Sequence, residues 1–80
     1  MSIYARAAKA ADIIMLTPTW GHLPRAFDDC FENGDGNEVL RQLLEWTVSS
    51  PLLRSYLVEH CGEAWYEVKC AELLSMRLIA

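Results

Sequence analysis

The sequence predicts a mainly α-helical fold, a compact bundle of four to five short helices in a single globular domain over residues 1–80. Three observations support this prediction. Hydrophobic residues make up 52% of the chain and charged residues 22%, as in folded globular proteins. Apolar side chains recur at three- and four-residue steps along most of the chain. Prolines and glycines interrupt this pattern and leave only short connections between the periodic segments.

The first helix is predicted over residues 3–16, an alanine-rich segment. Ser2 stands where a side chain commonly caps the first turn. The apolar stripe of this helix is expected to comprise Tyr4, Ala7, Ala8, Ala11, Ile14 and Met15. Residues 13–17 contain enough β-branched side chains for a short strand to be an alternative there. Pro18 ends either element, because the residue before a proline is disfavoured in the helical conformation.

A loop is predicted over residues 17–23, with Trp20 and His22 on either side of Gly21. The Trp20 ring either covers the core or stands exposed as an anchor for a partner, since large aromatic side chains serve both purposes. The sequence leaves both alternatives open, and Trp20 is a candidate binding residue.

A second helix is expected to begin with Pro24 in its first turn, where a missing amide hydrogen leaves no helical bond unmade. Its residues follow the pattern of an amphipathic helix. The face turned to the core is expected to carry Phe27, Cys30 and Phe31. The opposite face is expected to carry Asp28, Asp29 and Glu32. Gly34 supplies the left-handed residue that commonly ends a helix, and Gly36 makes the next turn flexible.

The third and fourth helices are predicted from their ends. Asp35 and Glu38 fit a capping box, in which each side chain bonds to the backbone of the other residue, so the third helix begins near Gly36. Pro51 begins the fourth helix and Gly62 closes it. The inward faces are expected to carry Val39, Leu40, Leu43, Leu44 and Trp46 in the third helix and Leu52, Leu53, Tyr56, Leu57 and Cys61 in the fourth.

The last segment, residues 63–80, carries apolar residues on more than one side. One stripe consists of Ala64, Val68, Ala71, Leu74 and Leu78. Other sides carry Trp65, Tyr66, Leu73, Met76 and Ile79. No single face can bury all of them. We therefore expect this helix either to be central in the bundle or to pair part of its surface with a second copy or a partner.

Acidic residues are concentrated between residues 28 and 45, a range that contains six carboxylates and Arg41 as its one basic residue. The whole chain has a net charge of −4. The expected partner-binding residues are Asp28, Asp29, Glu32, Asp35, Glu38 and Trp20. The seven lysines and arginines form no basic stripe, which argues against direct nucleic-acid binding. No apolar run approaches the ~20 residues of a membrane-spanning helix, and no secretion signal is recognisable. We expect a cytoplasmic protein.

No motif indicates catalysis or metal binding. The three cysteines lack the paired spacing of disulfide frameworks and zinc sites, and we expect them to be reduced and mostly buried. Residues 28–38 fail as a calcium loop, because Phe31 would fall at a ligand position. His22 and His60 accompany no recognisable nucleophile motif. We expect neither enzyme activity nor a cofactor.

A small acidic domain without catalytic motifs is suited to binding another macromolecule. In size, acidity and lack of motifs, the whole chain resembles phage-encoded anti-CRISPR proteins, which bind CRISPR effector complexes and block target DNA recognition or cleavage. The resemblance implies a basic, nucleic-acid-handling protein partner in the host cytoplasm, and it transfers no functional residue. One alternative is a homo-oligomeric helical regulator or structural subunit that pairs through residues 65–79. A helix-turn-helix over residues 38–61 is a weaker alternative, since its second helix offers only Arg54 to phosphates.

Overall fold

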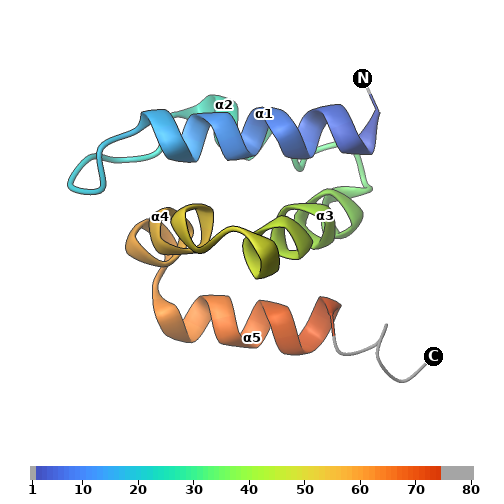
Figure 1. Cartoon of the computed structure of the whole chain (residues 1–80). Coiled ribbons are helices and arrows are strands. Elements are labelled where there is room, and N and C mark those ends of the chain that lie inside the picture. The colour runs from blue at the N-terminus through green and yellow to red at the C-terminus, as the bar shows by residue number, and fades with distance from the viewer. Residues whose placement is uncertain (1, 75–80) are drawn as a thin grey trace.

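The structure is a computed structural model that describes residues 2–74. This part of the chain contains five α-helices and no strand: α1 (Ile3–Leu16), α2 (Arg25–Asp29), α3 (Gly36–Ser49), α4 (Pro51–Cys61) and α5 (Glu63–Leu73). The helices form three layers, with α1 and α2 in the first, α3 and α4 in the second, and α5 in the third (Figure 1). The predicted mainly helical bundle is confirmed.

Both ends of α1 are closed by side chains next to the helix. The Ala5 amide donates to the Ser2 hydroxyl at 3.0 Å, which confirms the predicted N-terminal cap. At the other end, the Thr17 amide and hydroxyl both donate to the Ile13 carbonyl, at 3.0 and 2.7 Å. The alternative of a short strand over residues 13–17 is wrong, because these bonds complete the last helical turn and outweigh the β-propensity of the segment.

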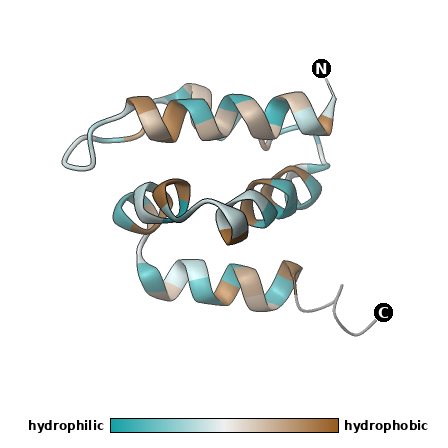
Figure 2. Ribbon diagram, in the orientation of Figure 1, coloured by the Kyte–Doolittle hydropathy of each residue, from teal (hydrophilic) through white to brown (hydrophobic). Residues whose placement is uncertain are grey.

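The buried residues of α1 are Arg6, Ala7, Ala10 and Ile14, so Ala7 and Ile14 are buried as predicted. Ala11 and Met15 are half-buried and pack against the core, as predicted. Tyr4 is 64% exposed, and its ring contacts Trp46 of α3 edge-on, with the ring centroids 5.0 Å apart. Figure 2 shows hydrophobic residues in the last turn of α1, where the helix leads into the α1–α2 connection. Part of this apolar surface lies outside the core.

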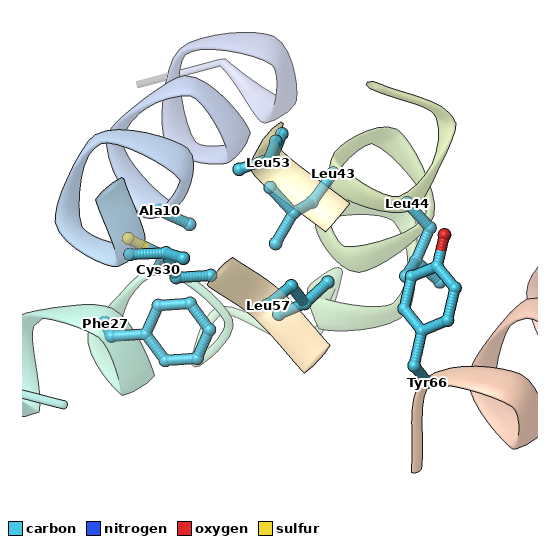
Figure 3. Packing of buried hydrophobic residues seen from close by; sticks show 9 residues of the cluster. Ala10, Phe27, Cys30, Leu43, Leu44, Leu53, Leu57 and Tyr66 are labelled. Carbon is cyan, nitrogen blue, oxygen red and sulfur yellow. The ribbon is translucent and has the colours of Figure 1, made fainter. Parts of the chain in front are cut away.

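The core lies between α1, α3 and α4. Figure 3 shows Leu43, Leu53 and Leu57 pointing toward one another, with Phe27 and Cys30 on one side and Tyr66 on the other. The buried cluster consists of Ala10, Ile14, Phe27, Cys30, Leu43, Leu44, Leu53, Leu57 and Tyr66. The prediction that Leu52 faces inward is wrong, since this side chain is 58% exposed at the start of α4.

α2 is shorter than predicted. It ends at Asp29, and Pro24 is its N-cap rather than part of its first turn. Phe27 is buried, and the Phe31 ring packs edge-on against it at 5.1 Å from beyond the helix end. Glu32 consequently lies in the connection to α3 instead of on a helical face.

Two glycines shape the α2–α3 connection. Gly34 has the predicted left-handed conformation, with φ of 80°, although α2 has already ended. At Gly36, a Cβ atom would collide with the Phe31 carbonyl oxygen. Gly36 therefore permits close approach of two backbone segments, which is a different role from the expected flexibility.

α5 is an outer helix, so the expectation of a central helix is wrong. It packs on α3 and α4, and Tyr66 is its single buried residue within the described part of the chain. In the first stripe, Val68 is 54% exposed and Ala64 and Ala71 are also exposed, whereas Leu74 packs against the core. The side that packs on the core carries Trp65, Tyr66, Cys70, Leu73 and Leu74. Met76, Leu78 and Ile79 lie outside the described residues.

Tyr66 attaches α5 to both helices of the middle layer. Its hydroxyl and that of Thr47 are 2.7 Å apart, and Thr47 donates its own proton to the Leu44 carbonyl at 2.5 Å. The Tyr66 hydroxyl must therefore be the donor to Thr47. The Arg54 guanidinium lies over the Tyr66 ring, 5.3 Å from its centroid. This contact engages the one basic residue that a helix-turn-helix interpretation would assign to phosphates.

Candidate functional site

Asp35, a predicted partner-binding residue, forms an ion pair inside the molecule. Arg6 Nη1 donates to both carboxylate oxygens of Asp35, at 2.6 and 2.7 Å. Nε and Nη2 of Arg6 donate to the Cys30 carbonyl, at 3.1 and 2.7 Å. The Arg6 side chain is only 7% exposed and that of Asp35 33%. This network joins α1 to both ends of the α2–α3 connection.

The network also explains why the predicted capping box is wrong. The Asp35 side chain accepts no hydrogen bond from the α3 amides, because Arg6 occupies its carboxylate. The Asp35 carbonyl accepts from the Glu38 and Val39 amides instead, at 3.0 and 3.1 Å. The hydrogen bonds from Arg6, together with its positive charge, hold the pKa of the Asp35 carboxyl below its usual value.

Sequence reasoning missed Arg6, although its position contained a signal. Arg6 lies four residues before Ala10 and eight before Ile14, so it falls on the buried stripe of α1. A buried guanidinium needs acceptors. The Arg6 guanidinium therefore requires an acceptor from another part of the chain, and Asp35 is one of the carboxylates outside α1.

The other four predicted carboxylates are exposed, but they have different surroundings. Asp29 lies 3.9 Å from Arg25 on the surface of α2. It also lines a depression of about 180 Å³, which is formed by Arg6, Lys9, Ala26, Asp29, Cys30 and Asn33. Within residues 2–74, Asp28, Glu32 and Glu38 have no ion-pair partner at all. Arg41 lies 4.0 Å from Glu45 on the surface of α3.

Trp20 is 88% exposed, so the alternative that it covers the core is wrong. Trp20 stands in a turn that is closed by the Gly21 amide, which donates to the Pro18 carbonyl at 2.9 Å. The loop is fastened to α4, since His60 Nε2 donates to the Thr17 carbonyl at 3.1 Å. His22, the other ring of the loop, is exposed.

The last turn of α4 interacts with both the loop that carries Trp20 and Asp28: His60 bonds to the Thr17 carbonyl, and Asp28 acts electrostatically on Cys61. Burial raises the pKa of the Cys61 thiol, and the negative charge of Asp28 raises it further. Cys61 follows His60, which binds the loop. The structure thus places Asp28 and the Trp20 loop around one end of α4, whereas Asp29 faces the depression beside Lys9 and Asp35 faces Arg6.

The described residues contain no cluster suited to metal binding. No group of three or more histidine, cysteine, aspartate or glutamate side chains is arranged around a common point in residues 2–74. All three cysteines are free, with Cys30 buried and the other two half-buried. The Cys30 thiol donates to the Ala26 carbonyl at 3.3 Å, and burial raises its pKa. A raised pKa makes a thiol less nucleophilic at neutral pH.

Comparisons with known proteins found no family model that matches the chain, no similar curated protein and no similar solved structure. Among the described residues, no helix has the length and apolarity needed to cross a membrane.

Proposed function

We propose that this protein is a non-catalytic inhibitor or adaptor that binds a basic nucleic-acid-handling protein complex through an acidic surface and blocks its nucleic-acid recognition. The resemblance to anti-CRISPR proteins suggests a CRISPR effector as the partner. One observation carries the proposal: residues 20–32 expose Trp20, Asp28, Asp29 and Glu32 on a short, continuous segment.

The chemistry of this segment suits a groove that normally holds phosphates. Carboxylates attract a basic surface over a distance and fix the register of the complex. An exposed tryptophan supplies a large contact area, and tryptophan is enriched among the residues that dominate binding energy. The buried Phe27 and the Arg6 network hold this segment on the bundle. Asp35 acts in this proposal by positioning the segment, while Glu38 extends its acidic surface along α3.

The test is affinity capture of the tagged protein from a lysate that contains a CRISPR effector, followed by washes at low and high salt. The variant Asp28→Lys/Asp29→Lys/Glu32→Lys reverses the charge of the segment. The control Asp12→Lys/Glu67→Lys/Glu72→Lys makes the same change in net charge at exposed positions on α1 and α5. Circular dichroism verifies that both variants are folded.

We expect the effector to bind wild type and control with 1:1 stoichiometry and to dissociate at high salt, because exposed charges are screened. The segment variant should lose the effector. Equal binding of the effector by both variants would contradict the proposal, and so would recovery of no basic protein by the wild type.

A second candidate function is that of a homo-oligomeric regulator or structural subunit. Three large apolar side chains outside the acidic segment favour it: Val48, Leu52 and Val68 are 72%, 58% and 54% exposed, on α3, α4 and α5. Sedimentation velocity tests this alternative. It predicts an oligomer that Val68→Glu dissociates, whereas a wild-type monomer at high protein concentration contradicts it.

A further inference from the structure

Two of the most exposed large apolar side chains lie close together in the sequence at one end of the molecule. Trp20 is 88% exposed, and Leu16, four residues earlier, is 84% exposed. Both belong to the region where α1 leads into its connection with α2. Figure 1 shows this connection at the same end of the bundle as the end of α4 and the start of α5.

Hydrogen bonds hold this apolar surface in place. The Thr17 side chain closes α1 directly after Leu16, and the Gly21–Pro18 bond closes the turn that contains Trp20. His60 fastens Thr17 to the last turn of α4. The loop is therefore anchored on both helices, and a partner that binds here meets a preformed surface. Preformed surfaces lose less conformational freedom on binding than mobile ones.

The charge around this surface is mainly negative. Asp28 lies close enough to act on the Cys61 thiol at the end of α4. Glu59 and Glu63 are exposed on either side of the same helix end. Arg25 is the nearest arginine or lysine to Trp20 in sequence, and it is placed beside Asp29.

We infer that this end of the molecule is a docking surface for a basic protein segment, with an arginine of the partner stacked on Trp20 and balanced by the surrounding carboxylates. The inference rests on the proposed function and specifies where and by what chemistry the partner is recognised. Arginine fits better than lysine, because a planar guanidinium stacks on an indole ring and also bonds to carboxylates. Leu16 would contact the apolar part of the same segment.

The test is a titration of the isotope-labelled full chain with tetra-arginine peptide, followed by two-dimensional NMR at low salt. We expect the largest shifts at residues 16–23, 28 and 59–63, and weaker binding of tetra-lysine. Trp20→Ala should weaken tetra-arginine binding about fivefold, because the loss of a cation–π contact worth about 1 kcal/mol changes the dissociation constant by that factor. Val68→Ala, which truncates an exposed apolar side chain on α5, should leave the affinity unchanged. Because Trp20 is exposed, the Trp20→Ala variant should remain folded, and its NMR spectrum should show this.

Three results would overturn the inference: largest shifts elsewhere on the molecule, no binding of tetra-arginine at millimolar concentration, or equal affinities for wild type and Trp20→Ala. Binding to phosphatidylcholine vesicles with a blue shift of tryptophan fluorescence that Trp20→Ala abolishes would also overturn it, in favour of a lipid surface. The capture experiment separates this failure from that of the proposed function. If the effector is lost from the Asp28/Asp29/Glu32 variant but retained by Trp20→Ala and by Glu59→Lys/Glu63→Lys, the proposed function stands and the docking surface is wrong.

Discussion

The two outer layers of the bundle are attached to its centre by different chemistry. On one side, a buried guanidinium joins α1 to the α2–α3 connection, through the Cys30 carbonyl and the Asp35 carboxylate. On the other side, α5 contributes one buried residue, Tyr66. The segment that exposes Asp28, Asp29 and Glu32 therefore lies on the side held by the buried ion pair. Variants on the two sides of the bundle should consequently differ in stability.

Replacement of Arg6 by alanine should have the largest effect. It leaves the Cys30 carbonyl and the Asp35 carboxylate without their donor and removes a buried side chain from α1. We expect a loss of about 4 kcal/mol in the free energy of unfolding, measured by urea denaturation. Arg25→Ala is the control, because Arg25 pairs only on the surface. Similar stabilities of the two variants would show that the buried network does not hold this side.

Replacement of Tyr66 by alanine should release α5. The change removes a buried ring together with its hydrogen bond to Thr47 and its contact with Arg54. We expect the free energy of unfolding to fall by about 3 kcal/mol. Hydrogen exchange should then show fast amides in α5 and protected amides in α1 and α3. Tyr66→Phe keeps the ring and should cost only about 1 kcal/mol. Loss of protection throughout the bundle would contradict the weaker attachment of α5.

Replacement of Gly36 by alanine tests the close approach within the α2–α3 connection. The added Cβ would collide with the Phe31 carbonyl, which is backbone and cannot rotate away. We expect destabilisation of about 2 kcal/mol, whereas Ala ordinarily stabilises a helix relative to Gly. Thermal denaturation measures the effect. An increase in the melting temperature would show that the connection relaxes easily.

The smallest expected effect is the pH dependence caused by Asp35. Its pKa is lowered in the folded state, so the unfolded chain takes up the proton first as the pH falls. The stabilisation is complete above the unfolded pKa, near 3.8, and is lost as the pH falls through the lower folded value. Between pH 7 and pH 3, the free energy of unfolding measured by urea denaturation should fall less for Asp35→Asn than for wild type. Equal losses for the two proteins would contradict this role of Asp35.

The helix boundaries were largely predictable from the sequence because they depend on local chemistry. Ser2 and Pro18 bracket α1, Pro51 stands at the first position of α4, and Gly62 lies between α4 and α5. The strand alternative at residues 13–17 is wrong because the β-propensity of these side chains is small compared with the hydrogen bonds that complete the last turn of α1.

The details that sequence reasoning missed all depend on contacts between distant residues. The capping box at Asp35 is locally favourable, but Arg6, 29 residues away, takes the carboxylate. The outer position of α5 depends on the hydrogen bond between Tyr66 and Thr47. The periodicity of the sequence does not reveal this pairing. The candidate surface was predicted as one acidic face. The structure divides it, because Asp29 and Asp35 have cationic neighbours, whereas Asp28 acts on Cys61 in the last turn of α4.

We propose that the acidic segment of residues 20–32, and not α5, recognises a basic protein partner. The most direct test is quantitative capture of a CRISPR effector by the Asp28/Asp29/Glu32 charge-reversal variant and by its matched control on α1 and α5. We predict that the control retains the effector and the segment variant loses it, with both proteins folded. Retention by the segment variant, or loss by the control alone, would contradict this account.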